Sequence, residues 1–82
     1  MSSKRDLTDW VVESLTRLGG GAVLVDVARD IWRHHEGDLR TSGDLFYTWQ
    51  YDMRWSANVL RRTGVMKSAE LSPHGFWQLS GA

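Results

Sequence analysis

The sequence predicts an α+β domain of the winged helix-turn-helix class, with three helices and a C-terminal β-hairpin wing. Apolar residues recur at helical spacing in three segments, and two short apolar runs near the C-terminus flank a turn that contains Pro73 and Gly75. The resulting order is helix, short strand, helix, helix, strand, turn and strand, as in a winged helix. With 82 residues, the chain is expected to form a single domain, residues 1–82.

The first two helices are expected over about 3–18 and 24–35. The first has one apolar stripe, made of Leu7, Trp10, Val11, Leu15 and Leu18. Three glycines at 19–21 should end it, because glycine adopts left-handed backbone conformations without steric cost. A short extended piece at 22–23 precedes the second helix, whose spacing is set by Leu24, Val27, Ala28 and Ile31. Residues 36–43 are expected to be a connection of open conformation.

The third helix is expected to begin between Asp44 and Thr48 and to end at Thr63, before Gly64. On a helical wheel, Met53, Ala57 and Leu60 share one side, and Ser56, Val59 and Trp55 extend it. The opposite arc is polar, with Tyr47, Gln50, Tyr51, Arg54, Asn58, Arg61 and Arg62. The remaining residues predict a hairpin with arms at 65–68 and 76–79.

Composition points to a folded, soluble chain whose stability comes from packing. The hydrophobic fraction is 41%, nine residues are aromatic, and there is no Cys to form a disulfide or a thiolate site. We find neither a secretory signal nor an apolar run of about 20 residues that would span a bilayer. A cytoplasmic protein is therefore expected, associated with the nucleoid if the source is bacterial.

The charges are balanced overall but unevenly distributed. Ten Lys and Arg face ten Asp and Glu. Residues 1–52 hold six basic and nine acidic side chains, whereas residues 53–82 hold four basic ones against Glu70 alone. A local basic face is therefore compatible with a net charge of zero.

Five tryptophans invite a base-stacking or aromatic-cage interpretation, but core roles are favoured for four of them. Trp10, Trp32 and Trp55 adjoin apolar helical stripes, and Trp77 alternates with a polar neighbour on a strand. Trp49, near Phe46 and Tyr47, is left open as a core residue, a partner-docking residue or a dimer contact.

Residues 45–82 also resemble a known family. The stretch from Arg54 to Met66 has a Trp, a small residue, a Leu and a basic pair before Thr63 and Gly64, and His74-Gly75 and an aromatic strand follow. This pattern resembles the N-terminal winged-helix domain of Mrr-type restriction endonucleases. The family often has Arg where His74 stands, and Ala where Thr63 stands. The resemblance implies docking on DNA and not cleavage, because the nuclease motif of those enzymes is absent from this chain.

Binding of double-stranded DNA through the third helix and the wing is the function we expect, in transcription regulation or chromosome organisation. The candidate base readers are Gln50, Tyr51, Arg54 and Asn58, with Tyr47 on the same face. The candidate phosphate or wing contacts are Arg61, Arg62, Lys67, Ser72 and His74. A homodimer is a further hypothesis, because helix-turn-helix proteins often read two half-sites.

The alternative is a winged-helix protein-interaction module that does not contact DNA directly. We expect no enzyme, since no catalytic spacing of Ser, His and Asp or of paired carboxylates is present. No cofactor, metal or small-molecule ligand is indicated. His34, His35, Glu36 and Asp38 carry metal-capable groups, but adjacent helical positions point about 100° apart and do not converge on one ion.

Overall fold

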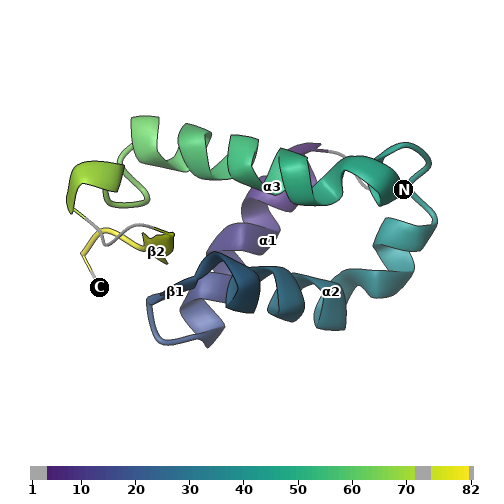
Figure 1. The fold of residues 1–82 in the computed structure, drawn as a ribbon, viewed down its shortest axis with the longest axis horizontal. Coiled ribbons are helices and arrows are strands. Elements are labelled where there is room, and N and C mark those ends of the chain that lie inside the picture. The colour runs from purple at the N-terminus through teal and green to yellow at the C-terminus, as the bar shows by residue number, and fades with distance from the viewer. Residues whose placement is uncertain (1–3, 72–74, 82) are drawn as a thin grey trace.

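A computed structural model describes residues 4–71 and 75–81 of the chain and shows an α+β fold (Figure 1). The helices are α1 (Lys4–Arg17), α2 (Leu24–Arg40) and α3 (Leu45–Arg62), with a short 3-10 helix, η1 (Ala69–Leu71). The strands are β1 (Gly21–Val23) and β2 (Phe76–Gln78), which pair in antiparallel register. The bounds of α1, β1 and α3 agree with the ranges predicted from hydrophobic spacing.

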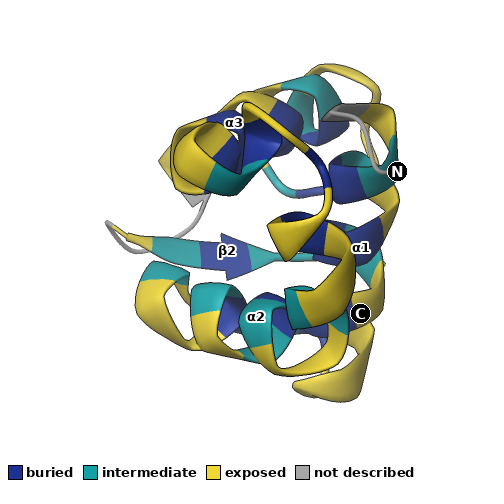
Figure 2. Ribbon diagram, turned by 90° about the vertical axis from the view of Figure 1, so that its right-hand side faces the viewer, coloured by how far each residue is buried: buried dark blue, intermediate teal, exposed yellow. Residues whose placement is uncertain are grey.

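Helix α1 is the centre of the molecule. It lies behind and between α2 and α3, which run along opposite sides of the long axis (Figure 1). Its Leu7, Val11 and Leu15 are completely buried, and the inward faces of α2 and α3 are buried where they meet it (Figure 2). The hydroxyl of Thr8 donates a hydrogen bond to that of Ser56, 3.0 Å away, joining α1 to α3. The predicted stripe of α1 is therefore its buried face, except that Leu18, just past the helix end, is exposed.

A salt bridge joins α1 to α2. The Nη2 of Arg17 lies 2.6 Å from the Oδ2 of Asp30, and its Nε donates to the same oxygen at 3.0 Å. Burial alone would raise the pKa of Asp30, but hydrogen bonds from Arg17 and Ser14 and the charges of Arg17 and His34 outweigh it, so this pKa lies below its usual value. The carboxylate is therefore held in its charged form at neutral pH.

Helix α2 is longer than predicted. The expected end at His35 is a kink, since His35 has non-helical angles (φ −129°, ψ 19°), and helical structure then continues to Arg40. The ring of His35 stacks on that of Trp10, with centroids 3.9 Å apart and planes 9° apart. After the kink, Arg40 donates to Glu36 at 2.7 Å, one helical turn back. The predicted connection over 36–43 was therefore wrong for most of its length.

The predicted hairpin is also only partly formed. In the part of the chain that is described, β2 pairs along its length with β1, and residues 65–68 join it through the single bridge Met66–Leu79. The amide of Lys67 donates to the carbonyl of Gln78, and that of Ser80 donates to Val65. The first arm does not continue because the chain turns into η1 at Ala69. The predicted turn at 72–74 lies outside the described residues.

The tryptophans divide between core and surface. Trp10, Trp49 and Trp77 are buried, which answers the open question about Trp49 in favour of the core. Trp32 is half-buried. Trp55, predicted to extend the buried side of α3, is 41% exposed, because it lies at the outer edge of that side rather than facing α1. Across the described residues, none of the helices has the length and apolar character that crossing a membrane requires.

Candidate nucleic-acid interface

The outer face of α3 is a continuous polar surface. On a wheel of about 100° per residue, its members fall within an arc of roughly 120°. They are Tyr47, Gln50, Tyr51, Arg54, Asn58, Arg61 and Arg62. At about 1.5 Å per residue the face is roughly 22 Å long. We call it the α3 face.

The predicted direction of these side chains is confirmed in large part. Tyr47 and Tyr51 are 82% and 76% exposed, and Gln50, Arg54, Asn58 and Arg62 are also exposed. The buried side is the predicted one, with Met53, Ala57 and Leu60 at no more than 6% exposure. A helix of this kind presents a rigid row of polar groups, as groove recognition requires.

The α3 face carries positive charge and no carboxylate. Within Leu45–Arg62 the acidic residue is Asp52, and it lies on the buried side, where the Thr48 hydroxyl donates to its Oδ2 at 2.8 Å. Arg54, Arg61 and Arg62 therefore have no acidic neighbour on the same face of the helix. Among the described residues, none of these three guanidiniums lies within ion-pair distance of a carboxylate.

The last turn of α3 combines this charge with a defined end. Gly64 takes a positive φ of 83°, and the amide of Val65 donates back to the carbonyl of Leu60. Arg61 and Arg62 stand where cations are stabilised by the helix dipole. Arg61 is only half-exposed, and its Nε is buried without a hydrogen-bond partner among the described residues. The predicted outward direction of Arg61 is therefore only partly confirmed.

Of the three residues predicted as wing contacts, the structure describes one. Lys67 is half-exposed, beside the bridge that joins Met66 to Leu79. Ser72 and His74, predicted as wing contacts, lie outside the described residues. The structure thus brings the helical candidates together on the α3 face.

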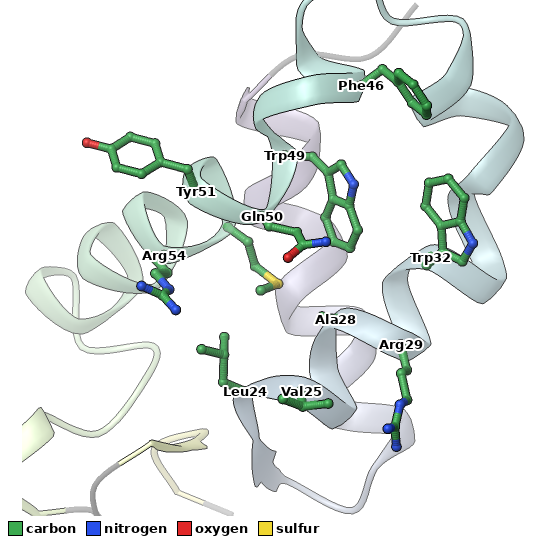
Figure 3. A pocket seen from close by; sticks show the side chains of 11 residues that line it. Leu24, Val25, Ala28, Arg29, Trp32, Phe46, Trp49, Gln50, Tyr51 and Arg54 are labelled. Carbon is green, nitrogen blue, oxygen red and sulfur yellow. The ribbon is translucent and has the colours of Figure 1, made fainter.

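A groove that sequence reasoning missed lies beside this face, between α2 and α3 (Figure 3). Its volume is about 770 Å³. From α2 it is lined by Leu24, Val25, Ala28, Arg29 and Trp32, and from α3 by Phe46, Trp49, Gln50, Tyr51, Met53 and Arg54. The buried side chains of Trp49 and Met53 form its floor. We call this the α2–α3 groove.

An aromatic cluster of Trp32, Phe46 and Trp49 forms one end of the groove. Trp32 and Trp49 stack with centroids 6.0 Å apart and planes 14° apart, and the Trp32 and Phe46 centroids are 6.4 Å apart. Arg40 covers this cluster, with its Cζ 5.2 Å from the Trp32 ring and 5.8 Å from the Phe46 ring. The cluster therefore stabilises the contact between the end of α2 and the start of α3.

The missed groove had only a weak signal in the sequence. The sequence shows aromatic residues at 46, 47 and 49, but the proximity of Phe46 and Trp49 to Trp32 depends on how α2 and α3 both pack against α1. Nothing in the sequence marks Val25 and Arg29 as groove residues, because an amphipathic helix commonly has exposed residues that contact no other element. Grooves between helices are set by tertiary packing, which periodicity does not encode.

Of the candidate metal residues of α2, His35 and Asp38 lie close, with 3.6 Å between Nδ1 and Oδ2, but the described residues contain no group of three that could hold one ion. The Nδ1 of His34 donates to the carbonyl of Asp30 at 2.9 Å, whereas His35 stacks on Trp10.

No protein-family model matches the chain, and comparisons with curated proteins and with solved structures give no significant match.

Proposed function

We propose that this chain is a winged-helix domain that binds double-stranded DNA, with the α3 face in the major groove. The observation that carries the proposal is the charge of that face. Three arginines and several neutral polar groups lie on it, and the acidic residue of the helix, Asp52, is buried away from it. An exposed helix of this composition suits a polyanion whose groove is about 12 Å wide.

Within this proposal the residues have different roles. Gln50 and Asn58 offer amides that suit an adenine edge, and Arg54 suits the O6 and N7 of a guanine. Tyr47 and Tyr51, at the N-terminal end, offer hydroxyls to phosphates or base edges. Arg61 and Arg62 would neutralise phosphates from the last turn of α3.

The sheet supports the same proposal. A strand after α1 pairs with the C-terminal strand, and residues 65–67 adjoin that strand on its other edge, as in a small winged helix. In this arrangement Lys67 would contact phosphate, and the segment with Ser72 and His74 would act as the wing. The resemblance of residues 45–82 to the N-terminal domain of Mrr-type endonucleases agrees with DNA docking. Transcription regulation or chromosome organisation is the role that we propose for this binding.

A salt titration tests the proposal against the alternative of a protein-interaction module. Binding of the full chain to a short duplex of random sequence would be followed by fluorescence anisotropy between about 50 and 200 mM salt. Each neutralised phosphate contributes about −0.9 to the slope of log K against log salt, so phosphate contacts by Arg61, Arg62 and Lys67 predict a slope of roughly −2.7. Absence of binding at the lowest salt concentration would favour the protein-interaction module.

A further inference from the structure

The α2–α3 groove has the features of a small-molecule site. Ligand pockets typically have volumes of about 300–1,000 Å³, apolar walls and a few converging polar groups. The groove has a volume of about 770 Å³, and its walls and floor are mainly aliphatic and aromatic. Trp49 and Met53 close its floor, whereas Val25 at its rim is 56% exposed. An apolar ligand would therefore cover surface that now contacts water.

The charged residues that line the groove are both cationic. Its lining contains two arginines and no Asp or Glu. Arg29 points away from α3 (Figure 3), and its Nη1 lies 3.7 Å from the Oδ1 of Asp26. Arg54 leaves α3 on the side that faces Leu24, and it has no carboxylate within ion-pair distance among the described residues. The amide of Gln50, one turn earlier, lines the same space.

We propose that the α2–α3 groove binds an aromatic carboxylate of two or three rings. The rings would lie over Leu24, Ala28 and the aromatic cluster, and the carboxylate would pair with Arg54 and accept a hydrogen bond from Gln50. A carboxylate matches the planar fork of a guanidinium, and the ring system matches the apolar floor.

This site would regulate DNA binding, a consequence that rests on the proposed function. Gln50 and Arg54 belong both to the groove and to the α3 face. A bound carboxylate would pair with the guanidinium of Arg54, so that this side chain could not contact DNA. It would also place a negative charge next to the DNA phosphates, which repel it. The ligand and the duplex should therefore bind competitively.

The probe we choose is 2-naphthoate, with the uncharged 2-naphthamide as its matched analogue. Isothermal titration calorimetry on the full chain should show binding of the naphthoate and at least about tenfold weaker binding of the amide. Arg54→Gln should remove most of that difference. Arg33→Gln, which removes an exposed α2 arginine outside the groove, should leave both affinities unchanged.

Several results would overturn the site. The first is equal affinity for naphthoate and naphthamide, and the second is absence of naphthoate binding. The third is an unchanged naphthoate affinity in the Arg54→Gln variant, provided that this variant keeps the parent's thermal midpoint. Naphthoate affinity that falls as the protein concentration rises would show that a second copy of the chain occupies the groove instead.

A second measurement addresses regulation. At a free naphthoate concentration ten times its Kd, duplex binding should weaken roughly tenfold, because ligand and duplex compete for Gln50 and Arg54. Unchanged duplex affinity with naphthoate bound would overturn the regulatory part. If the chain bound no duplex, the proposed function would fail, whereas the calorimetry would still decide whether the groove is a site.

Discussion

Gly21 lies directly against the ring of Phe76 across the β1–β2 pair. A Cβ at position 21 would be 2.9 Å from Cε2 of Phe76 and 3.2 Å from the carbonyl oxygen of Trp77. Because Gly21 pairs with Gln78 in the register, this contact sets how closely the C-terminal strand approaches the strand after α1. The absence of a side chain at position 21 is therefore a packing requirement.

Gly21→Ala is expected to destabilise the fold by about 1–3 kcal/mol, since the ring and the Trp77 backbone would have to shift. Urea unfolding measures the change. Gly37→Ala is the matched control, because a Cβ there meets nothing within 4 Å and Gly37 lies in α2. It should stabilise by about 0.5–1 kcal/mol through helix propensity. Equal effects at the two positions would mean that the β1–β2 contact is not close.

Asp30→Asn is expected to lower stability at pH 7 by about 0.5–1 kcal/mol, because it weakens the bridge from Arg17. The pKa of Asp30 lies below its usual value in the folded state. Its contribution is therefore present above the unfolded-chain pKa of ~3.9 and is lost as the pH falls through the lower folded-state pKa. Parent and variant should converge in acid, as followed by urea unfolding at several pH values.

Glu36→Gln is the control for Asp30→Asn. It removes the ion pair between Glu36 and Arg40, which has a similar N–O distance of 2.7 Å. Both side chains of this pair are about half exposed. A surface pair of this kind should change stability by no more than about 0.5 kcal/mol. A larger loss from Glu36→Gln than from Asp30→Asn would contradict the importance assigned to the α1–α2 salt bridge.

The two sides of α3 should respond differently to truncation. Leu60→Ala removes a buried side chain and should cost about 2–5 kcal/mol through the cavity it leaves. Tyr51→Ala, on the 76% exposed side chain, should change stability by less than about 0.5 kcal/mol. Thermal and urea unfolding both report this. A large loss from Tyr51→Ala would show that the α3 face is not a free surface.

Self-association is a separate prediction. Tyr47 projects from the start of α3, whereas Trp49 is in the core. If two copies read adjacent half-sites, sedimentation of the protein–duplex complex should show two chains on one duplex. One chain on every duplex, and a monomer without DNA at high concentration, would remove the hypothesis.

Local patterns predicted much of the helical framework. The stripe of α1, the end of that helix at glycines and the buried side of α3 depend on residues close in sequence, so spacing alone located them. The outward direction of Arg54 and Asn58 followed from the same wheel. Periodicity alone therefore predicts most of the α3 face.

Contacts between residues far apart in sequence explain why the end of α2, the hairpin pairing and the α2–α3 groove were not predicted correctly. The kink at His35 accompanies stacking on Trp10, a residue of another helix. The continuation to Arg40 brings its guanidinium over Trp32 and Phe46, which no local pattern specifies. The preference of β2 for β1 over its expected hairpin partner, and the α2–α3 groove, likewise depend on how distant elements meet.

The most direct test of the central claim compares two double variants with the same loss of charge. Arg54→Gln with Arg62→Gln removes two cations from the α3 face. Arg5→Gln with Arg33→Gln removes two exposed cations from α1 and α2. Both variants should keep the parent's unfolding midpoint, because all four side chains are exposed.

Duplex affinity, measured by fluorescence anisotropy across a series of salt concentrations, tests whether the α3 face binds DNA. We predict that the α3 pair weakens binding and reduces the magnitude of the salt slope by at least the roughly 0.9 that the phosphate contact of Arg62 contributes, whereas the α1–α2 pair leaves affinity and slope near those of the parent. Equal affinities and slopes for the two variants would contradict the assignment of the α3 face as the DNA-binding surface.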